Sequence, residues 1–142
     1  MSNVPIHVHG GDAPALHALL DQRINEFNAA ATGYHDAESF SAAHQDSHGA
    51  VLAGVYGYTW GGCAYVSHLW VAQSMRGQGI GSALLAAAES HARTRECRVI
   101  FLATHSFQGP EFYARLGYSN QGVLEDHPVG HRSILLEKRL LA

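Results

Sequence analysis

The sequence has few of the residues that mark a thiol-ligated metal site, a redox-active protein or a strongly basic protein. Of its 142 residues only two are cysteines, Cys63 and Cys97, and they lack the Cys-x-x-Cys spacing of a zinc knuckle or redox motif. We expect both to be reduced packing residues. The chain has nine Lys and Arg and twelve Asp and Glu, which gives a net charge of -3. This charge argues against nucleic acid as the main partner, because binding to phosphates requires a basic face. A mildly acidic surface tolerates a cationic small molecule instead.

Long apolar runs are also missing. No stretch reaches the length of a bilayer span, and the amino terminus lacks a basic region followed by an apolar one. We therefore expect no membrane partner and a cytoplasmic location. With 46% hydrophobic and 15% charged residues, a chain of 142 residues can form one packed core. We predict a single domain over residues 1–142.

Histidine, in contrast, is abundant, and eleven histidines raise the question of a metal site. His7 and His9 alternate along a predicted strand, and His44 and His48 lie on either side of a predicted turn. No pair joins a further ligand in the i, i+4 arrangement of a helical metal motif. The sequence therefore predicts no metal.

Hydrophobic periodicity and turn residues predict a mixed α/β order along the chain. A short strand over residues 4–8 precedes a helix that Asp12 caps, that has Pro14 near its first turn and that ends near Gly33. An antiparallel meander from Ser39 to Val71 includes strands over 50–58 and 63–71. Then come a helix over 80–95, a strand over 98–103, a short helix over 107–117, and strands over 118–124 and 131–138. On the helix over 80–95, Glu89 and Arg93 are expected to pair on the solvent face.

The stretch Arg76-Gly77-Gln78-Gly79-Ile80-Gly81 lies between a predicted strand and a predicted helix. Its glycines allow a tight turn and a close approach of the backbone to a ligand, and the helix that follows points free N–H groups at that place. Such an arrangement favours an anion, most often a phosphate. The spacing fits neither a P-loop nor a Gly-x-Gly-x-x-Gly dinucleotide fingerprint. The alternative is a glycine-rich loop that binds nothing.

A second motif follows, Phe112-Tyr113-Ala114-Arg115-Leu116-Gly117-Tyr118. The two motifs, with one helix and one strand between them, resemble those of the GNAT superfamily of N-acetyltransferases, and the order of elements is similar along nearly the whole chain. The resemblance implies a mixed, splayed central sheet of six to seven strands flanked by helices. It also implies acetyl-CoA as the cofactor, a sheet that opens where the strand over 63–71 parts from the strand over 98–103, and a Tyr113 that points at the cofactor sulfur.

The resemblance assigns a set of residues to the cofactor, because the glycine loop would hold the pyrophosphate and the preceding strand would pair with the pantetheine arm. This set is Leu69, Val71, Arg76, Gly77, Gln78, Gly79, Ile80, Gly81, Ser82, Ser106 and Tyr113. The N–H of Val71 would face the thioester oxygen, a kind of contact whose loss typically raises a barrier by about 3 kcal/mol. Tyr113 would protonate the departing thiolate. Ser106 stands where the superfamily often has Asn.

The residue that takes the proton of the acceptor amine stays open at this point. Histone-type members of the superfamily have a glutamate six residues before the terminal valine of the strand, where this chain has Tyr65. The base candidates are His68, Glu111, Glu125, Asp126 and His127. The candidate catalytic set is Tyr113, Val71 and His68. Candidates for contact with the acceptor are Asn25, Glu26, Tyr34, Trp60, His68, Asp126 and His127.

The expected activity is an acetyl-CoA-dependent N-acetyltransferase that moves the acetyl group directly to a primary amine of a small molecule. A loose resemblance to aminoglycoside modifiers points to a kasugamycin-like antibiotic as one acceptor. The alternatives are a protein or peptide amine acetyltransferase and a non-catalytic acyl-CoA-binding sensor, and the intact Tyr113 favours an enzyme over the sensor. The resemblance also allows a homodimer.

Overall fold

The computed structural model describes residues 3–140, and the chain divides into two compact units between Tyr34 and His35. The N-terminal unit contains α1 (Pro14–Thr32), as predicted, with Pro14 in its first turn. The helix ends where Gly33 adopts a left-handed φ of 79° and donates its N–H to the carbonyl of Ala29. The prediction that Asp12 caps the helix is wrong, because Ala13 is the N-cap and no side chain bonds the free amides.

The predicted strand over residues 4–8 is also wrong. These residues have no strand assignment, and they pair with no strand that the structure describes. Alternation of apolar and polar residues over five positions is a weak signal, because an extended segment becomes a strand only when a neighbour accepts its backbone hydrogen bonds.

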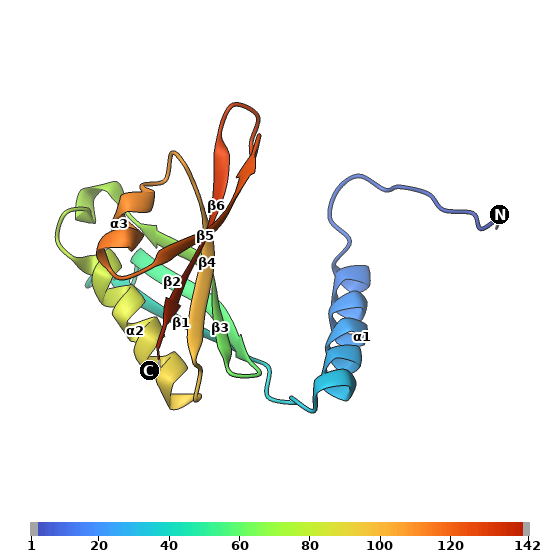
Figure 1. Ribbon diagram of the computed structural model, residues 1–142. Coiled ribbons are helices and arrows are strands. Elements are labelled where there is room, and N and C mark those ends of the chain that lie inside the picture. The colour runs from blue at the N-terminus through green and yellow to red at the C-terminus, as the bar shows by residue number, and fades with distance from the viewer. Residues whose placement is uncertain (1–2, 141–142) are drawn as a thin grey trace. The chain divides into compact units, whose positions relative to one another are not determined.

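Six strands form one sheet in the C-terminal unit (Figure 1). They are β1 (Glu38–Gln45), β2 (Val51–Trp60), β3 (Cys63–Val71), β4 (Val99–His105), β5 (Ser119–Glu125) and β6 (Arg132–Arg139). The strand order is β1-β2-β3-β4-β6-β5, with β3 and β4 parallel and the other neighbours antiparallel. α2 (Ile80–Thr94) connects the parallel pair, as a crossover must. The mixed sheet and its meander are confirmed.

α2 supplies the helical side of the core of this unit. Leu84, Leu85, Ala88 and Ala92 recur at helical spacing and are buried, and the helix contacts β1, β2 and β3. Alanine at two of these positions lets the helix axis approach the sheet closely. The buried residues that complete the core are Ala53, Val55, Ala64, Val66, Cys97, Ile100, Leu102, Tyr118, Leu136 and Leu140.

Glu89 does not pair with Arg93 on the solvent face of α2, as periodicity predicted. It is buried, with 6% of its surface exposed, and it accepts hydrogen bonds from the Tyr118 hydroxyl (2.9 Å) and from Lys138 Nζ (2.8 Å). Residue 89 lies beside the apolar stripe, and two partners distant in sequence satisfy both carboxylate oxygens there. Burial, and then the neighbouring Glu89, raise the pKa of Tyr118 far above its usual range.

The sheet opens between β3 and β4, which confirms the predicted splay. The two strands pair only between Cys63–Tyr65 and Val99–Phe101, so β3 runs on for six residues without β4 beside it. A β-bulge coincides with this parting, because Gly57 pairs with Val66 and Tyr56 with His68, leaving Ser67 as the extra residue. The bulge also changes which side chains face the core: Ala64 and Val66 do so before it, Leu69 and Val71 after it.

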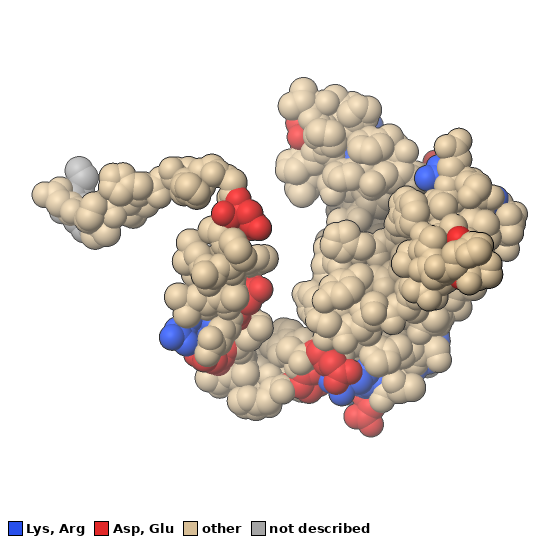
Figure 2. All heavy atoms as spheres, turned by 180° about the vertical axis from the view of Figure 1, so that it is seen from behind, with Lys and Arg blue, Asp and Glu red and all other residues tan. Residues whose placement is uncertain are grey.

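Charged side chains are sparse on the face of the C-terminal unit that Figure 2 shows, and acidic and basic groups neighbour one another at one end of it. Arg95 and Glu38 form an ion pair in this unit, with 3.7 Å between Nη1 and Oε2. Between residues 3 and 140 the structure contains no helix with the length and apolarity that a bilayer crossing demands.

Candidate active site

The glycine loop connects β3 to α2, and its glycines serve two different purposes. Gly77 and Gly79 adopt left-handed φ values of 80° and 78°, and Gly79 is the N-cap of α2. Only glycine takes this conformation readily, so these two positions set the path of the backbone. Gly81 instead provides space, because a Cβ there would lie 3.3 Å from the Phe112 ring and 3.6 Å from Val71.

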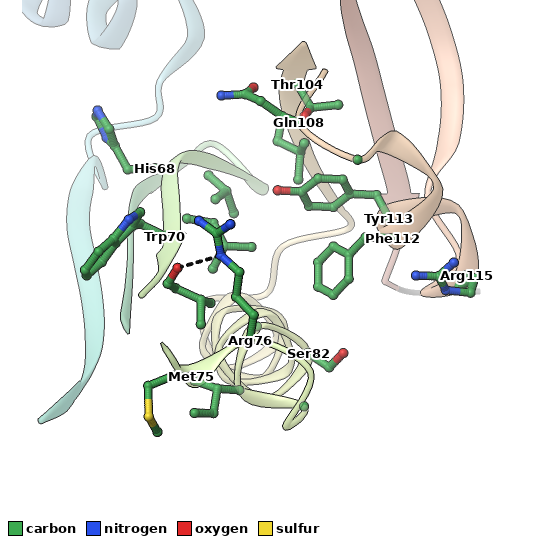
Figure 3. A pocket seen from close by; sticks show the side chains of 18 of the residues that line it. His68, Trp70, Met75, Arg76, Ser82, Thr104, Gln108, Phe112, Tyr113 and Arg115 are labelled. Atoms are coloured by element: carbon green, nitrogen blue, oxygen red, sulfur yellow. Dashed lines mark hydrogen bonds between the residues drawn. The ribbon is translucent and has the colours of Figure 1, made fainter. Parts of the chain in front are cut away.

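The loop delivers the free N–H groups of the first turn of α2 into a cleft. No side chain caps this end of the helix, and no acidic residue lies in its first turn. The positive end of the helix dipole and the free amides favour an anion. Arg76 lies on the β3 side of the helix start, where its Nε donates to the carbonyl oxygen of Val71 at 3.1 Å (Figure 3).

The end of β3 offers backbone groups to the same cleft. Ala72 donates its N–H to Leu52 O, so Ala53 and Val71 form a pair without hydrogen bonds to each other. The N–H and C=O of Val71 therefore point away from β2, toward the side from which β4 has parted. Leu69 lies two residues earlier and points its backbone groups the same way. An extended ligand with amide groups can pair with such an edge as an added strand does.

Tyr113 enters the cleft from α3 (Pro110–Arg115), where Gly109 as N-cap and Pro110 in the first turn start the helix. The Tyr113 ring contacts the rings of Phe112 and Tyr118 edge-on, with centroids 5.0 and 5.9 Å apart. Figure 3 shows its hydroxyl directed into the pocket, with His68 and Trp70 on the opposite side. Burial raises the pKa of Tyr113, so the phenol keeps its proton at neutral pH.

His68 lies on β3 directly after the bulge. Its Nδ1 is 2.8 Å from the Ser67 hydroxyl, and that hydroxyl also donates to the carbonyl oxygen of Tyr56 at 3.1 Å. The Tyr56 ring packs edge-on against the imidazole, with centroids 6.4 Å apart. Two neighbouring groups thus fix the orientation of a side chain that is otherwise exposed.

The cleft has a volume of about 940 Å³ and contains most of the predicted cofactor residues. Its lining includes Leu69, Val71, Arg76, Gly77, Gly79, Ile80, Gly81, Ser82 and Tyr113, together with His68. Two predicted cofactor residues lie outside the lining. Gln78 is one of them, and the other is Ser106, whose hydroxyl accepts a hydrogen bond from the N–H of Arg132 at the start of β6.

The predicted acceptor residues are scattered. Within the C-terminal unit only His68 lines the cleft, whereas Trp60 lies at the other end of β2 and β3, beside Cys63. Asp126 and His127 belong to the turn between β5 and β6, where Asp126 Oδ1 accepts from Gly130 and His127 Nδ1 contacts Glu125 O. Asn25, Glu26 and Tyr34 belong to the N-terminal unit. Their roles stay predictions.

The cleft narrows the choice of a base. Of the five candidates, His68 lines it, and Glu111, Glu125, Asp126 and His127 do not. Among the lining residues that the structure describes there is no Asp or Glu, and the charged side chains are Arg76 and Arg115. Within residues 3–140, no three His, Cys, Asp or Glu side chains are grouped so that they could bind a metal ion.

Sequence reasoning missed several lining residues, chiefly Trp70, Thr104, Phe107, Gln108, Phe112 and Arg115. Phe112 and Arg115 lie within the second motif, and Trp70 precedes Val71, so proximity to the motifs was the available signal. Thr104 is at the end of β4, and only the parting of β3 from β4 brings it to the cleft.

Residues 12–118 match the model of the acetyltransferase (GNAT) family. The chain belongs to the GNAT family. Acetyl-CoA is the cofactor of these acetyltransferases, and the chain is an acyltransferase. The free amides, the Arg76 guanidinium, the exposed edge of β3 and the size of the cleft fit such a group, whose parts are a diphosphate, an amide-bearing arm and a thioester.

Other GNAT proteins resemble the chain over most of its length. An acetyltransferase of Agrobacterium fabrum is 34% identical over 128 residues, which are 90% of this chain and 93% of the relative. The crystal structure of an acetyltransferase from Bacillus cereus ATCC 14579 has a TM-score of 0.77 and 33% identity, and the match covers 94% of this chain and 97% of the other. The blasticidin-S acetyltransferase of Streptomyces morookaense is 39% identical over 93 residues, 65% of this chain and 68% of the relative.

Proposed function

We propose that this GNAT protein transfers the acetyl group of acetyl-CoA directly to a primary amine of a small molecule. One observation carries the proposal: a histidine held by a hydrogen bond to Ser67 and a protonated tyrosine line the same cleft as the glycine loop. Such a pair supplies both proton transfers of amide formation from a thioester. The glycine loop by itself would explain binding of the cofactor but not catalysis.

Acetyl-CoA supplies the acetyl group as a thioester when it is bound. The amides that follow Gly79 and the guanidinium of Arg76 would hold its diphosphate. Leu69 and Val71 would pair with the pantetheine arm through their backbone, and the N–H of Val71 would donate to the thioester oxygen. Because this N–H belongs to a sheet strand, it is held in place before the reaction, as an electrostatic contribution to catalysis requires.

The remaining work of the protein is to move two protons. His68 Nε2 would accept a proton from the attacking amine as the new C–N bond forms, and Tyr113 Oη would give its proton to the sulfur as the C–S bond breaks. An amine with a pKa of about 10.4 needs roughly 4.6 kcal/mol to become neutral at pH 7, so a base at the cleft matters. Tyr113 is suited to the second transfer because burial keeps its phenol protonated.

Neither thiol offers a competing covalent route. Cys97 is buried, Cys63 donates its Sγ hydrogen to the Trp60 carbonyl, and neither lines the cleft. Burial raises the pKa of both thiols, which keeps them in the less nucleophilic form. These facts support direct transfer without an acyl-enzyme.

The proposed acceptor is a small amine-bearing antibiotic, and blasticidin S is the first compound to test because the relative from Streptomyces morookaense is named for it. A kasugamycin-like aminoglycoside stays a candidate. The aminoglycoside is less favoured because the described cleft lining contains no carboxylate to pair with its several ammonium groups. A peptide amine is the alternative within the enzyme class, and an acyl-CoA sensor is the alternative outside it.

The test is release of CoA from acetyl-CoA in the presence of a panel of amines: blasticidin S, kasugamycin, a multiply charged aminoglycoside and a peptide with a free amino terminus. We expect turnover with a small-molecule amine, abolished by exchange of His68 for Gln and strongly lowered by exchange of Tyr113 for Phe. Tight binding of acetyl-CoA without turnover on any amine would favour the sensor. Turnover on the peptide alone would move the assignment to protein amines.

A further inference from the structure

We infer that Ser67 is a positioning residue for the base: it holds the His68 imidazole with its hydrogen on Nδ1, so that the lone pair lies on Nε2. The inference rests on the proposed acetyl transfer, in which His68 accepts the proton of the amine. Nothing in the glycine loop or in the second motif points to Ser67. Only the bulge brings its side chain beside the imidazole.

The single hydrogen of the Ser67 hydroxyl decides which tautomer His68 adopts. A serine hydroxyl has a single hydrogen to donate, and a carbonyl oxygen can only accept. The contact of 3.1 Å between Ser67 Oγ and Tyr56 O therefore uses the hydroxyl hydrogen. In the contact of 2.8 Å between Ser67 Oγ and His68 Nδ1, the hydrogen must then come from Nδ1. A neutral imidazole with its hydrogen on Nδ1 presents a lone pair at Nε2.

The opposite tautomer is disfavoured by the same contacts. A hydrogen on Nε2 would set the lone pair of Nδ1 against a lone pair of Ser67 Oγ, unless the hydroxyl left Tyr56 O. Protonation at Nε2, in contrast, leaves the bond from Nδ1 to Ser67 unchanged. The ring can thus take up a proton from an amine and release it to water without turning.

The bulge explains why these three groups meet. Ser67 is the extra residue between the pairs Gly57–Val66 and Tyr56–His68, so its hydroxyl reaches across to Tyr56 while His68 follows on the same strand. Gly57 lies opposite the bulge and makes room for it by having no side chain, since a Cβ there would be 2.0 Å from Tyr65 O. An alternation without the bulge would point residues 67 and 68 to opposite faces of the sheet.

The described lining of the cleft contains no carboxylate that could orient the ring in place of Ser67. The titratable group that packs on His68 from β2 is Tyr56, and the other titratable or charged side chains of the cleft lining are Arg76, Arg115 and Tyr113. A neutral hydroxyl fixes the tautomer without stabilising the imidazolium as a carboxylate would.

The direct test is the ¹⁵N spectrum of protein labelled at its histidines, with the His68 signals assigned by their loss in His68→Gln. With the ring neutral, we expect the wild-type protein to show Nδ1 bearing hydrogen and Nε2 bearing none. A wild-type His68 with its hydrogen on Nε2 would overturn the inference, whatever the activity. This measurement needs neither the cofactor nor an acceptor.

Kinetics supply the second test. Ser67→Ala should lower kcat/KM by roughly three- to tenfold, as loss of one hydrogen bond does, while the affinity for acetyl-CoA is kept. The ¹⁵N spectrum of this variant should show His68 divided between its two neutral tautomers, a change that a merely structural role would not produce. Ser67→Thr, which retains a hydroxyl, should restore both the activity and the single tautomer, and Ser39→Ala on β1 is the matched control. A Ser67→Ala variant with unchanged kcat/KM and with His68 still in one tautomer would contradict the role. If no amine is acetylated at all, the proposed function fails while the tautomer can still be measured.

Discussion

Arg76 donates from Nε to the carbonyl oxygen of Val71 across 3.1 Å, and this bond joins the first residue of the glycine loop to the last residue of β3. The backbone of Val71 thus has its carbonyl engaged by the loop, while its N–H points toward the side that β4 has left. The same guanidinium keeps further donors free beside the start of α2. One arginine therefore couples the proposed diphosphate site to the proposed thioester site.

Arg76→Gln should weaken the binding of acetyl-CoA by roughly tenfold, because a charge-assisted contact to the diphosphate is lost. The dependence of the affinity on salt should become shallower in the variant. Isothermal titration at two salt concentrations measures both effects. Arg98→Gln, an exposed arginine that lies outside the cleft lining, is the matched control. Equal affinities of Arg76→Gln and wild type would remove Arg76 from the site.

Tyr113→Phe should lower kcat by about 10²-fold with little change in the affinity for CoA, because the ring is kept and only the proton donor is lost. Burial raises the pKa of Tyr113, so ionisation of this phenol should not reduce activity until the pH passes about 10. Steady-state kinetics and titration with CoA check the two parts. Tyr58→Phe, on β2 outside the cleft lining, controls for loss of a hydroxyl. A kcat equal to that of wild type would exclude Tyr113 as the acid.

Much of this site could be predicted from the sequence, because its parts are local. The glycine spacing at Gly77 and Gly79 reflects backbone angles that other residues avoid, and the start of α2 follows directly from it. The helices and the six strands could be predicted for the same reason, because hydrophobic periodicity is also a local property of the sequence. The bulge at Ser67 could not be predicted, since it depends on pairing with β2, and the regular alternation along β3 conceals the point where the core face changes.

Long-range polar contacts are the other feature that could not be predicted from the sequence. Glu89 has the sequence context of a solvent-facing residue, with Arg93 one turn later, and nothing local signals that Tyr118 and Lys138 approach it. Helical periodicity alone therefore predicts that the Glu89 carboxylate faces solvent. The two partners come from segments 29 and 49 residues away, which no helical period can reveal.

Glu89→Ala should lower the free energy of unfolding by roughly 3 kcal/mol, because it leaves the Lys138 charge and the Tyr118 hydroxyl without their acceptor. The Lys138 side chain is 26% exposed, so water offsets part of the loss. Replacing the three groups together, as Glu89→Leu, Tyr118→Phe and Lys138→Met, should recover most of the stability. Urea unfolding measures each variant. A loss below about 0.5 kcal/mol in Glu89→Ala would show that the network contributes little.

Tyr118→Phe should alter the dependence of stability on alkali. The folded state raises the pKa of Tyr118, so above about pH 10 the unfolded phenol loses its proton while the folded one keeps it. The unfolded state then binds fewer protons, and stability falls as the pH rises. At pH 7 the variant should be less stable than wild type by about 1 kcal/mol, and this difference should shrink above pH 10. A stability difference between wild type and Tyr118→Phe that stays constant up to pH 11 would contradict a raised pKa of Tyr118 in the folded state.

Gly57→Ala should destabilise the protein by at least about 2 kcal/mol, because the new Cβ would lie 2.0 Å from the carbonyl oxygen of Tyr65 and 2.9 Å from the Phe40 ring. The backbone of β2 or β3 must move, at the place where the sheet begins to open. Gly54→Ala is the control on the same strand, since its Cβ would meet Ala42 O at 3.4 Å. Thermal unfolding of the two variants checks the difference, and equal stabilities would show that the bulge adapts.

A crystal structure with acetyl-CoA is the decisive test of whether this cleft binds and orients the cofactor. We expect the diphosphate on the amides that follow Gly79, the thioester oxygen at the N–H of Val71, and the sulfur within hydrogen-bond reach of Tyr113 Oη. A cofactor bound elsewhere on the chain, or bound with its sulfur away from Tyr113, would contradict it.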